Sequence, residues 1–472
     1  MPNSDRLSAL DAMFVGIETT ELHMHVGAVL VFEAGPLANA DGGVDFERIA
    51  SYLETALVHL PNYRRRLKPT PGLRHPVWVD DQHFDMSYHL RHAALPRPGS
   101  ERLLKRLAGR IFSQSLDRKR PLWEFWVVEG LENNRFALIT KVHHAMVDGV
   151  AGVGALAGLL RANTDESFQP VTTTWQPEDV PSGLDLLLSE LRHRKEGIGA
   201  LVERARSSWN LVRSGSGEGT KAVASGVLGI IKTGLLPAPA TCINPRHVGP
   251  HRRLDVCRYD MKTIKAIKNE LGGKVNDVIL ALCAGALRRF LARCGDSLAD
   301  LEKFRVLMPV SIRGKHKGQS GNQIALSLLD LPLHIDDPLL RYKAILESTA
   351  KSKGQSHHAE GTALLEEISD VTADSLMRES IRVAGVLRPY NVIISNIPGP
   401  PFDLFLLGAR LEEVFPLVPL FYQQGLGIGI FSYAGTLSIG LGADRDAVPN
   451  LHELASDFDT AFKELAAVAG LD

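Results

Sequence analysis

Two adjacent histidines, His143 and His144, have the clearest capacity for chemistry in this chain. They stand in the run Val142-His143-His144-Ala145-Met146-Val147-Asp148-Gly149. Histidine is the usual group for proton transfer near neutral pH, because its unperturbed pKa is about 6.5. An aspartate at a fixed spacing can orient such a histidine or brace the turn that carries it. The run therefore predicts a site of acid–base chemistry.

A predicted strand must position these histidines. Residues 135–142 alternate so that one face holds Phe136, Leu138, Thr140 and Val142. If this pleat continues, His143 and His144 point to opposite faces, and only one of them can enter a given cavity. After Gly149, apolar residues recur at helical spacing as far as Leu160. The motif is thus predicted in a strand-to-helix turn, with Asp148 placed to cap the helix.

Other interpretations of these residues stay open. A histidine pair is commonly structural or exposed, and Asp-Gly is an ordinary turn. Adjacent histidines on opposite strand faces cannot easily share one metal ion. His23 and His25 are two residues apart and resemble a pair of metal ligands, but the sequence identifies no third ligand. We therefore predict no metal site.

Composition indicates an ordinary globular protein. A length of 472 residues favours two or three domains, and 44% hydrophobic with 23% charged residues is ample for a large core. The net charge of −1 provides no global field that would attract nucleic acid. Neither a signal-peptide h-region nor an apolar run long enough to span a bilayer is found. The four cysteines lack C-x-x-C spacing, which is typical of free thiols in a reducing cytosol.

The chain is predicted to divide into three parts. Residues 1–180 form an N-terminal lobe that mixes strands and helices, residues 181–245 form a helical linker, and residues 246–472 form a second α/β lobe. The second lobe is predicted to hold strands at 304–310, 323–333 and 391–394, a glycine-rich hairpin at 425–442 and a last helix at 451–468. Gly425, Gly427 and Gly429 leave one strand face without side chains. A backbone or a ligand such as an acyl chain can therefore approach this face closely.

The linker carries a basic amphipathic pattern that suits a membrane surface. Apolar residues including Trp209 fall on one helical face and several arginines on the other, and the stretch 223–236 is more apolar still. We predict peripheral membrane association through residues 198–236. The alternative is that this face packs on the two lobes as a tether.

Several blocks of the chain resemble one enzyme family. His-His-x-x-x-Asp-Gly after a strand is similar to the signature of the coenzyme A-dependent acyltransferase superfamily, which includes chloramphenicol acetyltransferase and peptide synthetase condensation domains. The other blocks resemble bacterial wax ester synthase/diacylglycerol acyltransferases, in that family's order. They are Ser8-Ala9-Leu10-Asp11-Ala12-Met13-Phe14, Met24-His25-Val26-Gly27, Pro121-Leu122-Trp123, Asn276-Asp277-Val278-Ile279-Leu280-Ala281 and Ser395-Asn396-Ile397-Pro398-Gly399-Pro400.

The resemblance implies two chloramphenicol acetyltransferase-like α/β lobes with the active site in a tunnel between them. It implies transfer of a long-chain acyl group from acyl-CoA to the hydroxyl of diacylglycerol, which makes triacylglycerol, or of a long-chain alcohol, which makes a wax ester. His144 would be the general base and His143 its support. The acyl thioester is already activated, so no covalent intermediate is needed, and the chain has no G-x-S-x-G nucleophile elbow.

The resemblance also assigns roles outside the histidine pair. Asn276 is expected to donate to the oxyanion or position the substrate, with Asp277 in support. Asn276 and Asp277 are predicted to precede a helix at 278–293, whose N-terminus favours negative charge, and a plain N-cap role for Asn276 is compatible with this. Asn396 is expected to border the donor channel.

In the wider superfamily the aspartate of the histidine motif pairs with an arginine. We therefore expect Asp148, followed by Gly149, to brace the channel through Arg313, although contact with His144 stays open.

The expected partners are acyl-CoA, the lipid acceptor and a membrane or lipid-droplet surface, with no nucleic acid and no cofactor, since acyl-CoA is a substrate. The expected location is the cytoplasm, at the inner face of the cell membrane. Two rival functions stay open: a same-fold acyltransferase with another acceptor, such as a condensation domain, and a non-catalytic lipid-binding relative. A binder would not need the base, so His144, Asp148 and Asn276 together favour catalysis.

Overall fold

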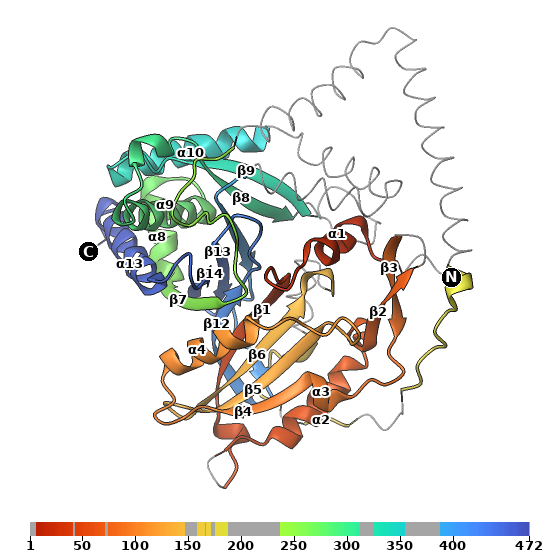
Figure 1. The fold of residues 1–472 in the computed structure, drawn as a ribbon. Helices are drawn as coiled ribbons and strands as arrows, with labels where there is room; N and C mark the ends of the chain where they lie inside the picture. The colour runs from red at the N-terminus through yellow and green to blue at the C-terminus, as the bar shows by residue number, and fades with distance from the viewer. Residues whose placement is uncertain are drawn as a thin grey trace, which may run out of the picture.

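Two six-stranded sheets, each covered by helices, form the framework of the molecule (Figure 1). The computed structural model describes residues 6–40, 43–70, 74–146, 158–165, 167–170, 175–186, 237–311, 324–354 and 388–471. This arrangement agrees with the predicted pair of α/β lobes.

The first sheet comes mainly from the N-terminal half of the chain. β1 and β6 pair antiparallel along their whole length, from His25 opposite His143 to Glu33 opposite Arg135. The strand predicted at 135–142 is confirmed, and β6 extends one residue further than expected. The strand order is β11 (Phe405–Leu406), β12 (Ala409–Leu417), β1 (His25–Glu33), β6 (Arg135–His143), β5 (Trp123–Leu131), β4 (Leu90–Ala94).

Alternating residues of this sheet feed two separate cores. Leu30 packs with α2 (Phe46–Leu57) on one face, and Val29 packs with α4 (Glu101–Phe112) on the other. The side-chain period of two in a strand produces this division. The remaining elements of this lobe are α1 (Ala9–Ile17), η2 (Gly35–Leu37), η3 (Pro61–Arg64), β2 (Arg65–Thr70), β3 (Arg74–Asp80) and α3 (Met86–His89).

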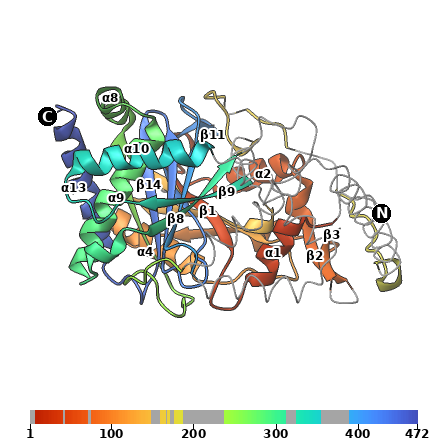
Figure 2. The ribbon, with the colours of Figure 1, turned by 90° about the horizontal axis from the view of Figure 1, so that it is seen from above.

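The second sheet comes from the C-terminal half. In the described part of the chain it is covered by four helices, of which α9 (Val275–Arg293) is buried along most of its length. Figure 2 shows α9, α10 and α13 together at the opposite end of the molecule from α1 and the β2–β3 hairpin. The strand order of the second sheet is β7 (Arg252–Asp260), β14 (Thr436–Asp444), β13 (Leu426–Tyr433), β10 (Val392–Pro398), β8 (Phe304–Ser311), β9 (Ile324–Leu331). The other elements are α8 (Met261–Leu271), η5 (Leu298–Leu301), α10 (Pro338–Gly354) and α13 (Leu451–Val468).

One segment of the C-terminal half crosses to the first sheet. β12 pairs with β1, with Leu417 opposite Gly27. The chain then passes over the glycine-rich face of β13 and β14, where a Cβ at Gly440 would collide with the carbonyl oxygen of Pro416 and one at Gly427 would lie 2.8 Å from Val418 Cγ2. The glycines are therefore needed for close approach of the chain's own backbone. The suggestion that an acyl chain occupies this face is wrong.

Most other predicted elements of the second lobe are confirmed with small shifts. The hairpin turns at Ala434-Gly435, and the last helix has the predicted bounds. The strand predicted at 391–394 runs further, to Pro398, so Asn396 lies inside β10 and not after it. The domain boundaries near 180 and 245 stay predictions, because residues 187–236 are outside the described part of the chain.

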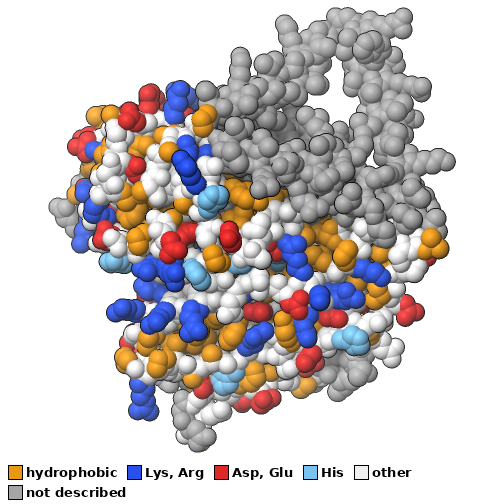
Figure 3. Space-filling view, viewed as in Figure 1, with side chains coloured by type: hydrophobic (Ala, Val, Ile, Leu, Met, Phe, Trp, Pro, Cys, Tyr) orange, Lys and Arg blue, Asp and Glu red, His pale blue; other side chains and the backbone are white. Residues whose placement is uncertain are grey.

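The surface is of mixed charge. Lys and Arg side chains are interspersed with Asp and Glu on the face in Figure 3, as a net charge near zero leads one to expect. Among the described helices, none is long and apolar enough to cross a membrane. The four cysteines are free thiols.

Candidate active site

The histidine pair lies at the end of β6, a buried strand. β6 lies between β1 and β5, so its residues from Phe136 to His143 are all buried. The strand ends at His143, because residues 144–146 turn into a short 3₁₀ helix, η4 (His144–Met146). The pleat therefore does not continue through His144, which was the condition for placing the two histidines on opposite strand faces. The two side chains nevertheless enter different surroundings.

The His144 ring packs against an aromatic side chain. Its ring stacks on Phe14 of α1, with centroids 3.9 Å apart and an angle of 28° between the planes. Its backbone N–H donates to the carbonyl oxygen of Met24 over 2.8 Å. Its Nδ1 atom is buried and has no hydrogen-bond partner among the described residues. Burial lowers the pKa of His144 to about 4, and the neighbouring His143 acts in the same direction. The imidazole is therefore neutral at physiological pH, the form that accepts a proton.

The His143 side chain stabilises the turn that follows β6. Its side chain is only 1% exposed. Nδ1 accepts a hydrogen bond from the backbone N–H of Ala145 over 3.1 Å, and Nε2 lies 3.5 Å from Glu18 Oε2. Nδ1 is thus hydrogen-bonded, whereas Nε2 faces the Glu18 carboxylate and has no hydrogen bond with a described residue. The arrangement supports the expected role of His143 as a structural partner of His144.

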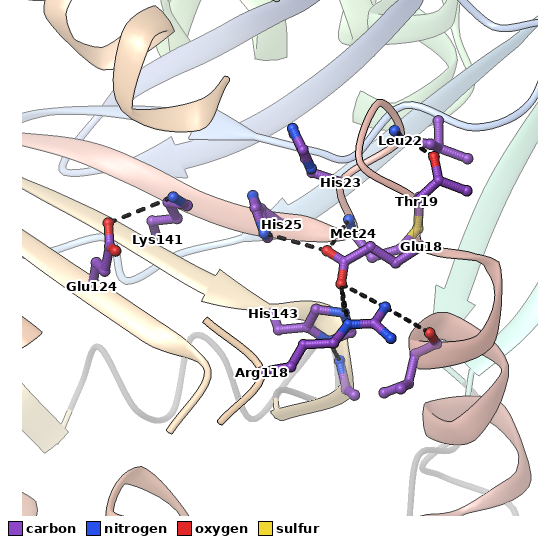
Figure 4. Close-up of polar contacts among 12 residues, drawn as sticks. Glu18, Thr19, Leu22, His23, Met24, His25, Arg118, Glu124, Lys141 and His143 are labelled. Atoms are coloured by element: carbon purple, nitrogen blue, oxygen red, sulfur yellow. Dashed lines mark hydrogen bonds and ion pairs between the residues drawn. The ribbon is translucent and has the colours of Figure 1, made fainter. Parts of the chain in front are cut away.

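Glu18, the C-cap residue of α1, is the centre of a buried polar network that sequence reasoning missed (Figure 4). Its carboxylate lies 3.4 Å from His25 Nε2, and Arg118 donates to Oε2 from Nε over 3.0 Å and from Nη2 over 2.8 Å. Burial on its own would raise the pKa of Glu18, but the contacts with His143 and His25 outweigh it and hold that pKa well below its usual range. Glu18 is thus a carboxylate, and an acidic residue directly after an apolar helix was the one sequence signal for it.

The histidines at the start of β1 line a small pocket between the lobes. The rings of His23 and His25 stack with centroids 5.2 Å apart, and His23 Nε2 contacts the carbonyl oxygen of Ser113 at 3.2 Å. Burial lowers the pKa of His25 to about 3. The pocket is lined by His23, His25, Phe112, Arg252, Leu254, Leu417, Val418, Pro419, Leu420 and Gly442.

The argument that these histidines lack a third metal ligand was wrong. Glu18, His23 and His25 each bring a ligand atom within 4.8 Å of the other two. Two features nevertheless disfavour a cation here. Both oxygens of Glu18 already accept hydrogen bonds, Oε2 from Arg118 and Oε1 from the Met24 N–H over 3.2 Å. Burial and the positive charge of Arg252 both lower the pKa of His23. The absence of a metal site therefore stays a prediction.

Asn276 and Asn396, predicted separately, are in contact. Asn396 Nδ2 donates to Asn276 Oδ1 over 3.1 Å, which joins β10 to the first turn of α9. The helix starts at Val275, three residues earlier than predicted, so Asn276 is not its N-cap. Lys274 has that position, and Asp277 accepts from the Lys274 backbone N–H over 2.7 Å. Asp277 thus completes the cap at the N-terminus of α9, so the side chain of Asn276 is not needed there.

Three predicted site residues cannot be placed. Asp148, Gly149 and Arg313 lie outside the described residues, as does the predicted helix start after Gly149. The structure brings His143 and His144 together at the end of β6, and Asn276 with Asn396 at the second sheet. Among described residues, no hydrogen bond joins these two groups directly.

Comparison with known proteins gives a consistent result over nearly the whole chain. A model of the wax ester synthase/diacylglycerol acyltransferase catalytic domain matches residues 7–279, and a model of the WS/DGAT C-terminal domain matches residues 320–466. A putative diacylglycerol O-acyltransferase of Mycobacterium tuberculosis (strain ATCC 25618 / H37Rv) is 34% identical over 98% of this chain and 90% of its own.

Solved structures agree with the fold. A wax ester synthase/diacylglycerol acyltransferase from Marinobacter aquaeolei VT8 has a TM-score of 0.68 and 26% identity, over 99% of this chain and all of that one. The first condensation domain of a calcium-dependent antibiotic synthetase has a TM-score of 0.59 over 99% of this chain and 96% of its own, and its 13% identity shows a shared fold only. The predicted architecture of two chloramphenicol acetyltransferase-like lobes is confirmed.

Proposed function

This chain belongs to the wax ester synthase/diacylglycerol acyltransferase family, and we propose how it carries out acyl transfer from acyl-CoA to a hydroxyl. His144 is the general base. The observation that carries this assignment is that burial keeps the His144 imidazole neutral, while its Nδ1 forms no hydrogen bond with any other described residue. A base must be unprotonated and unengaged to take the hydroxyl proton.

The reaction proceeds by direct attack. As His144 takes the proton, the acceptor oxygen bonds to the thioester carbonyl carbon and an oxyanion forms. Collapse of that intermediate breaks the carbon–sulfur bond, and the proton held by His144 passes to the departing thiolate of coenzyme A. A positioned base typically contributes about 10²- to 10⁴-fold. No residue of the chain becomes acylated.

Asn276 is the proposed donor to the oxyanion or to the substrate. Its oxygen accepts from Asn396, so its NH₂ group is the part that remains to donate. It lies in the first turn of α9, where free N–H groups and the helix dipole favour negative charge. His143, Gly149 and Asp277 hold the two motifs in shape, and Asp148 with Arg313 braces the channel between the lobes.

The acceptor is a lipid hydroxyl, on diacylglycerol or a long-chain alcohol. Such substrates reside in membranes or lipid droplets, so the enzyme works at that surface on the cytoplasmic side, with residues 198–236 as its contact. It uses no cofactor or metal, because the thioester is already activated and acyl-CoA is consumed as a substrate. Neither nucleic acid nor a carrier protein takes part.

The test is an ester assay with both acceptors. Labelled palmitoyl-CoA is supplied with dipalmitoylglycerol or with hexadecanol, and products are separated by thin-layer chromatography. We expect a labelled triacylglycerol, a labelled wax ester or both. Absence of both esters, under conditions in which the Marinobacter relative is active, overturns the proposal and favours a lipid binder. Free palmitate as the only product overturns it as well.

A further inference from the structure

We infer that Glu18 is a positioning residue that fixes the backbone of His144 from both sides. The inference rests on the proposed role of His144 as the base. Contacts around the buried Glu18 carboxylate determine where the catalytic ring of His144 lies, although the two residues are far apart in sequence.

The first side of this clamp runs through Met24. Oε1 of Glu18 accepts the backbone N–H of Met24 over 3.2 Å. The carbonyl oxygen of Met24 in turn accepts the backbone N–H of His144 over 2.8 Å. Since Met24 is completely buried, water cannot replace these bonds. Glu18 and His144 are thus connected through one peptide segment.

The second side runs through His143. Oε2 of Glu18 lies 3.5 Å from His143 Nε2, and His143 Nδ1 accepts the backbone N–H of Ala145 over 3.1 Å. The residues before and after His144 are therefore both linked to the same carboxylate. This fixes the point at which β6 ends and the turn begins.

A third contact fixes the surface on which the ring rests. Arg118 donates to Glu18 and also, through Nη2, to the carbonyl oxygen of Val15 over 2.8 Å. Val15 is next to Phe14 in α1, and Phe14 stacks on the His144 ring. The guanidinium thus ties the carboxylate to the helix that bears the stacking partner.

The charge of Glu18 matters as well as its shape. The carboxylate is 6% exposed and faces two histidines and an arginine. Hydrogen bonds to a charged group are roughly twice as strong as neutral ones. A neutral amide at this place keeps one acceptor but also presents NH₂ hydrogens to donors, so part of the network must rearrange. A displacement of about 1 Å in a catalytic group can cost about 100-fold in rate.

The experiment compares Glu18→Gln with Glu21→Gln. Glu21 lies three residues further along the chain, and it is exposed, so Glu21→Gln is the matched control. We expect Glu18→Gln to lower kcat by about 10- to 100-fold, with KM for palmitoyl-CoA within about twofold of the parent. The control keeps the parental kcat. A parental kcat in Glu18→Gln, or an equal loss in Glu21→Gln, overturns the inference.

A second comparison separates positioning from general destabilisation. If Glu18 acts through His144, adding Glu18→Gln to His144→Ala causes no further loss of the residual rate, because effects of residues that act as a unit are non-additive. An equal additional loss in both backgrounds overturns the inference. Should Glu18→Gln fail to fold, Arg118→Gln is tested in the same two backgrounds, with a smaller loss of about three- to tenfold expected in the parent only.

The same measurements distinguish this inference from the proposed function. A parental kcat in His144→Ala contradicts the base itself. A large loss in His144→Ala, with a parental kcat in Glu18→Gln, leaves the base in place and contradicts only the role of Glu18.

Discussion

The side-chain amide of Asn396 donates a hydrogen bond to the side-chain oxygen of Asn276 over 3.1 Å. The bond joins β10 to the first turn of α9, and its two residues are 120 positions apart in the chain. It also selects one orientation of the Asn276 amide, because an oxygen that accepts from Asn396 leaves the NH₂ group to donate elsewhere. This is the donor required at the proposed oxyanion.

The first prediction concerns that donor. Asn276→Asp keeps an acceptor for Asn396 but removes the NH₂ group. We expect kcat to fall by roughly 10²- to 10³-fold, the typical loss of one oxyanion donor. Steady-state kinetics and a thermal melt decide the matter, with Asn276→Gln as a control that retains an amide. An Asn276→Asp variant with parental turnover would exclude Asn276 from the reaction.

The second prediction concerns pH. The neutral form of His144 is the base, and its lowered pKa of about 4 keeps that form present at pH values where an ordinary histidine, at 6.5, is half protonated. We expect kcat to stay constant from pH 8 down to about 5.5 and to decline only on approach to the lowered pKa. Rates are measured under acyl-CoA saturation, with folding monitored at each pH. A midpoint near 6.5 would show that burial does not control this group.

The third prediction concerns Asp148, which we expect to brace the lobes and not to relay protons. Breaking a buried ion pair costs roughly 3–5 kcal/mol, so Asp148→Ala should lower Tm as well as kcat. Arg313→Met should have the same effect, and the double variant should be little worse than either. If Asp148→Ala melts like the parent while activity is wholly lost, the bracing role is wrong and contact with His144 is favoured.

The fourth prediction concerns the linker. Replacing residues 198–236 by a flexible Gly/Ser segment should reduce flotation of the protein with vesicles of phosphatidylcholine and phosphatidylglycerol, since a basic amphipathic segment binds anionic interfaces. Activity on a short, water-soluble alcohol serves as the control for folding. Unchanged flotation would contradict the membrane role and favour the tether.

Local sequence patterns predicted the elements that local forces determine. Alternation identified β6, the glycine-rich stretch at 425–442 identified the hairpin, and helical spacing identified α13. Boundaries were less accurate where the local signal was weak. Lys274 is not a favoured N-cap residue, so nothing in the sequence announced that α9 begins before Asn276.

Contacts between distant segments could not be predicted in this way. β12 returns to the first sheet, and the reason for the glycines of β13 and β14 appears only once Pro416 lies across them. Glu18 was missed for the same cause. Its partners His25, Arg118 and His143 come from three separate parts of the chain, and periodicity carries no information about such a meeting.

The most direct test of the account is the rate of ester formation by His144→Gln, with the matched variant His143→Gln beside it. Gln cannot act as a base, so we expect kcat of His144→Gln to fall by roughly 10²- to 10⁴-fold, with KM for palmitoyl-CoA nearly unchanged and the fold intact by circular dichroism. His143→Gln should lose less activity and more stability. A His144→Gln enzyme that makes ester at the parental rate would contradict the central claim.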